Sequence, residues 1–179
     1  MMKSIPVWKQ ELSDGVHAAR LASLYCCSPA ETASEAARYT AVLDGLEKTF
    51  GSHAEAGLYS APGRTEIGGN HTDHQHGRVL AGSVNIDMIA AAAPNDKNQL
   101  RVQSEGYDLC VIDLNDLEAR KEEENTTAAL LRGECAAFTQ RGAQRGQSWP
   151  VWTSTSLPTC RRAAAFPLPP PLRCSSASS

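Results

Sequence analysis

The sequence of 179 residues has no long apolar run and only a small net charge. No stretch reaches the roughly 18 consecutive apolar residues of a transmembrane helix, so we expect no membrane span. The N-terminus, MMKSIPVWKQELSDG, lacks the uninterrupted apolar core of a secretory signal. A net charge of −3 gives no reason to expect nucleic acid as a partner. We therefore expect a cytoplasmic protein that binds neither membranes nor nucleic acids.

Cysteine is present, but its spacing lacks the patterns that hold a metal. The six cysteines form no CxxC pair and no zinc-ribbon arrangement. In a cytoplasmic chain this spacing favours free thiols. We expect the adjacent Cys26 and Cys27 to pack rather than to perform redox chemistry.

Acidic residues are missing from one end of the chain. Residues 146–179 contain none of the 20 acidic residues but hold six of the ten prolines. Residues 1–145 therefore carry a net charge of −6, and the tail carries +3. The tail has neither helical nor strand periodicity. Its composition alone predicts a disordered segment of low complexity.

The codons of this tail indicate another origin. Read two nucleotides downstream from Trp149, with third bases chosen freely, they can encode AGVDVYLTSDVPAGGGLSSSAAFEVLLGV, a string that the protein does not contain. We infer that the tail is a frameshift product and that the frame changes between residues 141 and 148. A genuine low-complexity tail is the alternative.

The first 50 residues predict helices. Residues 5–25 show a helical pattern that Gly15 weakens at its middle. A capping box of Ser28 and Glu31 opens a second helical region, for which Gly51 is a plausible stop. Its buried stripe is expected to contain the apolar residues Ala37, Tyr39, Val42, Leu43 and Leu46.

The pattern then changes to short strands. These are expected at residues 57–63, 79–84, 87–94, 99–105 and 109–114. The acidic run 122–125 is typical of a solvated loop, and residues 126–140 return to helical spacing. Together these patterns predict an α+β fold, with N-terminal helices and then a mixed, mostly antiparallel sheet on which helices pack.

Residues 62–80, PGRTEIGGNHTDHQHGRVL, concentrate the side chains suited to chemistry. Glycines let the backbone turn sharply and approach a ligand closely. The short polar side chains of Asn70, His71, Thr72 and Asp73 suit the hydroxyl groups of a sugar. Arg64 beside them can stabilise negative charge on an oxygen during phosphoryl transfer.

This stretch has four other interpretations. Short polar residues with glycines usually form an ordinary surface loop. His71, Asp73, His74 and His76 lie close in sequence, but their spacing does not match HExxH or zinc-finger motifs, so we expect no metal site. No GxxxxGK[ST] or GxGxxG loop is present for a nucleotide. Arg64 on its own is more often the partner of a surface salt bridge.

Residues 63–80 resemble the signature of galactokinases, GRxNxIGEHTDYxxGxVLP, without a gap. Galactokinases belong to the small-molecule kinase superfamily that includes homoserine and mevalonate kinases. The resemblance continues less specifically through Asp87 to residue 145. It implies the N-terminal domain of the small-molecule kinase fold (ribosomal-protein-S5-like), here incomplete. The expected organisation is a helical extension (1–50), a partial galactokinase domain (51–145) and an out-of-frame tail (146–179).

The resemblance also implies roles for single residues. Arg64 matches the arginine that contacts the reacting hydroxyl and the transferring phosphate. His71 and Asp73 match residues that hydrogen-bond the sugar. Asn70 stands where the family more often has Glu, which leaves the preferred galactose-like sugar open, and His74 replaces the usual Tyr.

The implied activity is ATP-dependent phosphorylation of the anomeric hydroxyl of galactose, with Mg²⁺. The phosphate loop GxGLSSSA and the catalytic Asp of a GxMDQ-type motif are not in this reading frame. We therefore expect the 179-residue chain to be inactive. Two alternatives are a kinase for a galactose derivative and a non-catalytic sugar-binding regulator derived from a kinase.

Overall fold

The computed structural model describes residues 2–69, 76–144 and 152–157. Its elements follow the order α1 (Ile5–Ser13), α2 (Ala18–Tyr25), α3 (Thr32–Phe50), β1 (Gly57–Gly68), β2 (Leu80–Pro94), β3 (Gln99–Gln103), β4 (Cys110–Asp113), the 3₁₀ helix η2 (Lys121–Glu123), α4 (Thr127–Gln144) and β5 (Trp152–Leu157). The predicted α+β class is confirmed. In the part of the chain that the structure describes, no helix is long and apolar enough to cross a membrane.

The helices break where the sequence predicts. Gly15 lies between α1 and α2 with a φ of +72°, a conformation that glycine adopts readily. Gly51 caps α3 with a φ of +83°. The start of α3 was predicted one turn too early. The Glu31 side chain does accept a hydrogen bond from the Ser28 N–H at 2.8 Å, but this pair closes a separate turn before the helix.

The buried face of α3 differs from the predicted stripe at one apolar position. Tyr39, Val42, Leu43 and Leu46 are buried as expected, whereas Ala37 is exposed. Ala37 is two residues from both Glu35 and Tyr39, which is about 200° around the helix, so it lies on the opposite side from these buried residues. Glu35 takes its place on the buried face.

The five-stranded sheet has the order β1-β2-β5-β3-β4. The pair β3–β5 is parallel and the other neighbouring pairs are antiparallel. The two strands predicted at 79–84 and 87–94 form the single strand β2, because the chain between them bulges rather than turns. Likewise β1 continues past residue 63 to Gly68.

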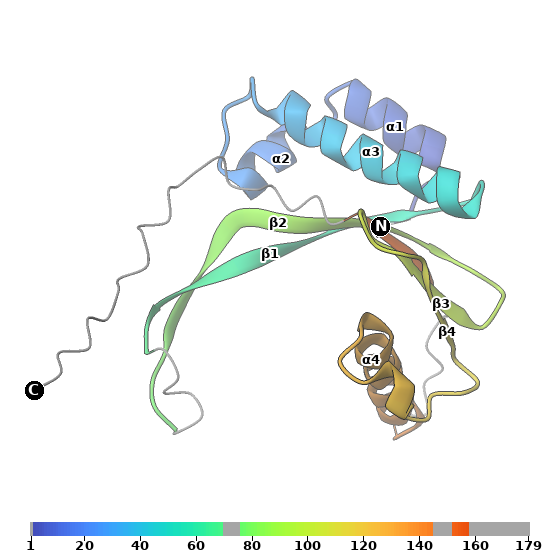
Figure 1. Ribbon diagram of the computed structural model, residues 1–179. Coiled ribbons are helices and arrows are strands. Elements are labelled where there is room, and N and C mark those ends of the chain that lie inside the picture. Colours follow the sequence, from blue (N-terminus) through green and yellow to red (C-terminus); the bar gives the residue numbers. More distant parts are fainter. Residues whose placement is uncertain (1, 70–75, 145–151, 158–179) are drawn as a thin grey trace, which may run out of the picture.

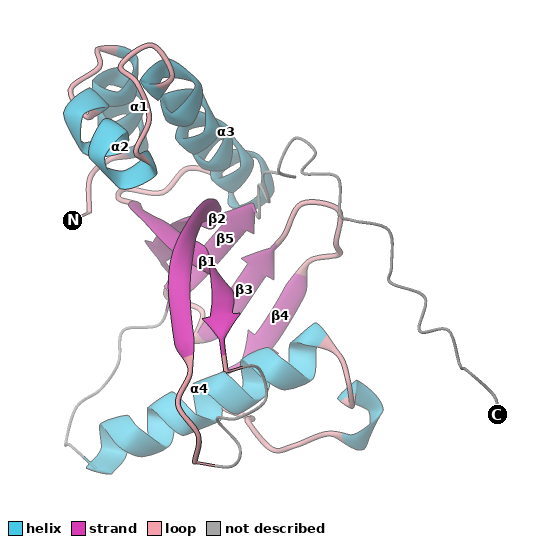
Figure 2. Cartoon of the chain, turned by 90° about the vertical axis from the view of Figure 1, so that its left-hand side faces the viewer, coloured by secondary structure: helices cyan, strands magenta, loops and turns pink. Residues whose placement is uncertain are grey.

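The helices lie in two layers on opposite sides of the sheet. Figure 1 shows α1, α2 and α3 above the sheet and α4 below it, and Figure 2 shows the same layering from the side. The main core lies between the sheet and the upper helices. Its fully buried residues on α3 and β2 are Val42, Leu43, Leu46, Ile89, Ala91 and Ala93. The alternation of residues 89, 91 and 93 places them on one face of β2.

Part of the tail is ordered, contrary to the prediction of disorder. Residues 152–157 form β5, which pairs with both β2 and β3. Backbone groups inside a sheet need hydrogen-bond partners, and β5 supplies them to two strands at once. The backbone position therefore selects a strand even though the segment has no clear apolar alternation. The remaining tail residues lie outside the described ranges.

Candidate functional site

The signature stretch forms the far part of the β1–β2 hairpin. Arg64 lies on β1, is exposed, and pairs in register with Ser83 of β2. Figure 1 shows both strands curving past the sheet toward the side on which α4 lies. The predicted sugar-binding residues Asn70, His71, Thr72 and Asp73 fall outside the described residues. The structure therefore places Arg64 alone among the predicted site residues.

A bulge immediately before Arg64 sets the direction of the hairpin. Pro62 pairs with Asp87, but the next pair is Arg64 with Ser83, so Gly63 opposes three residues of β2. A Cβ at Gly63 would lie 3.2 Å from the carbonyl oxygen of Ile86 and 3.2 Å from Cγ2 of Val84. Bulges bend a strand and redirect its side chains. Glycine at position 63 thus permits the close approach that presents Arg64.

A second glycine is required at the end of the hairpin. Gly69 has a φ of +90°, and a Cβ there would lie 2.4 Å from the carbonyl oxygen of Arg78. Neither the backbone angle nor the space suits another residue. Gly68, its neighbour, has neither constraint. The glycine pair predicted to allow a close turn therefore has one indispensable member.

The Arg64 guanidinium forms no ion pair with any residue in the described ranges. Within the described residues, Arg64 therefore does not act as the partner of a surface salt bridge, which was the alternative interpretation. A guanidinium keeps its positive charge at every physiological pH and has five N–H donors. Arg64 can therefore bind an anionic group or a sugar oxygen beside the hairpin tip.

Sequence reasoning missed a buried polar cluster on the other side of the bulge. Asp87 is 5% exposed and accepts hydrogen bonds from Tyr25 at 2.5 Å, Ser60 at 2.6 Å and Arg38 at 2.7 Å. Arg38 also pairs with Glu35, at 2.5 Å. The signal was available, because an acidic residue within the apolar strand 86–93 requires a buried partner.

The protonation states of this cluster follow from its hydrogen bonds. Burial disfavours the charged form of Asp87, but the bonds from Ser60, Tyr25 and Arg38 outweigh burial and lower the pKa of its carboxyl below the usual value. Burial and the hydrogen bond to Asp87 raise the pKa of Tyr25. Although burial acts against its charge, Asp87 and Glu35 raise the pKa of Arg38. The cluster thus holds an ionised Asp87 between neutral hydroxyls and a cation.

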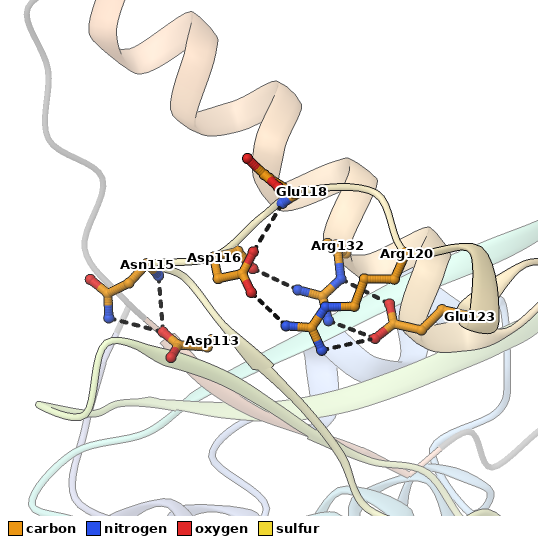
Figure 3. Close-up of polar contacts among 7 residues, drawn as sticks. All are labelled: Asp113, Asn115, Asp116, Glu118, Arg120, Glu123 and Arg132. Atoms are coloured by element: carbon orange, nitrogen blue, oxygen red, sulfur yellow. Dashed lines mark hydrogen bonds and ion pairs between the residues drawn. The ribbon is translucent and has the colours of Figure 1, made fainter.

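A second network ties α4 to the loop before it (Figure 3). Arg132 is 4% exposed, donates to both carboxylate oxygens of Glu123 at 2.7 and 2.8 Å, and donates to the carbonyl oxygen of Asp116 at 2.6 Å. Arg120 bridges Asp116 and Glu123 from outside. The prediction of a solvated acidic run holds for Glu122 and Glu124 but is wrong for Glu123. Its bonds with Arg132 lower the pKa of Glu123.

The described residues offer no cluster that fits a metal ion. They contain no group of three or more His, Cys, Asp or Glu side chains that could hold a metal. Three of the four residues that lie close in sequence as potential ligands, His71, Asp73 and His74, are outside the described ranges. The cysteines in the described part, Cys26, Cys27, Cys110 and Cys135, are free thiols.

The fold is similar to that of a solved kinase structure. The structure resembles the crystal structure of Lactococcus lactis galactokinase complexed with galactose, with a TM-score of 0.55 and 20% sequence identity. The match covers 66% of this chain and 30% of that one. The chain therefore has the fold of the small-molecule kinases over the matched part.

Sequence comparisons match part of the chain to galactokinases. Residues 46–94 match the galactokinase galactose-binding signature. The galactokinase of Ligilactobacillus salivarius is 35% identical over 83 residues, which are 45% of this chain and 21% of that protein. The galactokinase of Lacticaseibacillus casei is 26% identical over 120 residues, or 66% of this chain and 31% of that protein. Over the matched residues the chain is similar to galactokinases, and it spans less than a third of the length of these two proteins.

Proposed function

We propose that the β1–β2 hairpin forms the sugar-binding half of a galactokinase-type site. Asn70, His71, Thr72 and Asp73 hydrogen-bond the hydroxyls of galactose or a galactose-like sugar. Arg64 contacts the anomeric hydroxyl and stabilises the charge that develops as a phosphoryl group arrives. In the complete reaction, ATP supplies that group with the help of Mg²⁺.

One observation carries this proposal: the galactose-binding signature at residues 46–94 coincides with the hairpin that presents Arg64. The signature includes all of β1 and β2 and the residues between them. Gly63 and Gly69 allow the close backbone approaches that aim Arg64 and close the tip. A loop of arbitrary composition would need neither glycine.

For the 179-residue chain itself, we propose sugar binding without turnover. The phosphate loop GxGLSSSA and a GxMDQ-type motif are not encoded in this frame. Phosphoryl transfer depends on positioning and on electrostatic stabilisation of the phosphates. Without residues that hold ATP, neither contribution can arise in this chain.

Binding is tested by saturation-transfer NMR of the 179-residue chain with galactose and with its C4 epimer, glucose. We expect a signal for galactose with a Kd on the order of 1 mM, as for half of a site. Asp73→Ala should abolish it, whereas the control Asp108→Ala, an exposed acidic residue outside the hairpin, should not. Equal signals from both sugars, or from both variants, would refute sugar recognition by the hairpin.

Turnover is tested by galactose-dependent release of ADP. The 179-residue chain should give no more product than Arg64→Ala, and activity clearly above that variant would contradict the proposal. We also propose that the frame changes between codons 141 and 148. Sequencing the gene there decides this, because a frame that does not encode GGGLSSSAAFEV downstream excludes it.

Asn70 supports a second candidate, a kinase for a galactose derivative. An amide offers a neutral acceptor and a donor where the galactokinase signature has a carboxylate. The NMR experiment repeated with N-acetylgalactosamine distinguishes this candidate, because a stronger signal than that of galactose would favour it. A non-catalytic regulator would bind sugar in the frame-restored protein without producing ADP.

A further inference from the structure

The buried polar cluster joins three separate elements to β2. Tyr25 comes from α2, Arg38 from α3 and Ser60 from β1, and each donates a hydrogen bond to Asp87. A second layer holds these donors in place: the Tyr25 and Tyr39 hydroxyls lie 2.7 Å apart, and Glu35 pairs with Arg38. We call the six residues Tyr25, Glu35, Arg38, Tyr39, Ser60 and Asp87 the Asp87 cluster.

The cluster is buried enough to constrain geometry. Asp87 is 5% exposed and Glu35 is 2% exposed. Charge-assisted hydrogen bonds in a low-dielectric interior are strong and directional, and an unsatisfied charge there is costly. Any displacement of β2 relative to α2 and α3 would break at least one of these bonds. The cluster therefore fixes β2 at this residue.

Asp87 occupies a special place in the hairpin. Its register partner, Pro62, is the last paired residue of β1 before the bulge at Gly63. Arg64 follows directly after the bulge and pairs with Ser83. A bulge loosens the ladder, and register beyond it must be specified by other contacts. The Asp87 cluster lies on the side of the bulge that is anchored to the core.

We propose that Asp87 is a positioning residue for the sugar site: its carboxylate ties the hairpin to α2 and α3 at the pair before the bulge and so sets the direction in which Arg64 is presented. This inference rests on the proposed function of the hairpin. It gives the N-terminal helices a part in sugar binding, although α1 and α2 lie outside the matched signature at residues 46–94.

The test uses Asp87→Asn in the 179-residue chain, which keeps the size of the side chain and removes its charge. The control is Leu46→Ala, a fully buried residue of α3 outside the cluster. The two variants are compared at urea concentrations that give equal global stability. We expect Asp87→Asn alone to increase amide exchange at residues 60–66 and 81–87. It should also weaken galactose binding at least about tenfold, by analogy with the loss of a residue that orients a metal ligand.

A triple variant separates positioning from stability. Arg38 also pairs with the buried Glu35, so all three charges are replaced together, as Asp87→Asn with Glu35→Gln and Arg38→Met. This leaves no unpaired buried charge and should recover much of the global stability. Under the proposal, hairpin protection and galactose affinity do not recover. If they recover with stability, or if Leu46→Ala matches Asp87→Asn in both measurements, the cluster only stabilises the fold and the inference is wrong.

The outcome is separable from the proposed function. If the wild-type chain does not bind galactose, the sugar site itself fails, and amide exchange alone decides whether Asp87 controls the hairpin. Unchanged exchange at residues 60–66 in Asp87→Asn would overturn the inference whatever the sugar result.

Discussion

Replacing three glycines one at a time by alanine separates backbone strain from steric overlap; two lie at the end of the hairpin and one ends α3. Gly68 has no atom within 4 Å of an added Cβ and no positive φ. Gly51 has a φ of +83° but open space around it. Gly69 has a φ of +90° and also lacks space, because its Cβ would lie 2.4 Å from the Arg78 carbonyl oxygen and 2.8 Å from the Cα of Val79. Alanine therefore meets no constraint at position 68, an unfavourable backbone angle at position 51, and both an unfavourable angle and a steric overlap at position 69.

The expected losses of folding stability increase in the order Gly68, Gly51, Gly69. Gly68→Ala should be neutral or stabilise by about 0.4–1 kcal/mol, because alanine restricts the unfolded chain. Gly51→Ala should cost about 1–3 kcal/mol for a backbone region that is nearly exclusive to glycine. Gly69→Ala adds overlap with backbone atoms, which cannot rotate away. We expect it to cost about 2–5 kcal/mol in total, from about 1–2 for strain and about 1–3 for overpacking.

The assay combines urea unfolding with amide hydrogen exchange. The hairpin end can open without unfolding the α3 core, so exchange at residues 64–69 reports the full effect of Gly69→Ala and global unfolding reports less of it. Gly51→Ala should instead appear in the global transition, because it ends α3. Equal behaviour of Gly68→Ala and Gly69→Ala would refute the close approach that closes the hairpin tip.

Two further predictions concern charges. Arg132→Met should increase amide exchange in residues 114–126 and leave amide exchange in α3 unchanged. Arg120→Met is the control, and it should increase exchange less because its side chain is exposed. Because the pKa of Asp87 is lowered by folding, its contribution to stability is complete above the unfolded pKa of about 3.9 and is lost as pH falls through the lower folded pKa. In Asp87→Asn, the free energy of unfolding should therefore depend less on pH below about pH 4. An unchanged pH dependence would contradict an ionised Asp87.

Local patterns predicted most elements correctly, because these elements depend on local signals. The break at Gly15, the end of α3 at Gly51 and the helix after residue 126 each follow from propensity and periodicity. Local patterns did not predict that the strands expected at residues 79–84 and 87–94 form one continuous strand. A bulge and a turn both interrupt alternation, and only pairing with β1 distinguishes them.

β5 shows the same limit more strongly. Residues 152–157 have no apolar alternation that predicts a buried strand, yet they occupy the sheet between β2 and β3. With third bases chosen freely, the proposed alternative frame can encode VDVYLTS here, which does alternate. In the chain itself, pairing with β2 and β3 rather than local alternation accounts for the strand.

The candidate site divides in a similar way. Its chemistry stays a prediction from the order of residues 62–80, where glycines, an arginine and short polar side chains follow one another. What holds it was not predictable, because Tyr25, Arg38 and Asp87 are far apart in sequence and meet only after α2 and α3 pack on the sheet. A fragment limited to residues 46–94 would keep the signature and the buried carboxylate but lose both of these donors. Asp87 would then have lost the cation that offsets its burial, and the register of the hairpin beyond Gly63 would have lost its anchor. The helices before the signature are therefore part of the unit that presents Arg64.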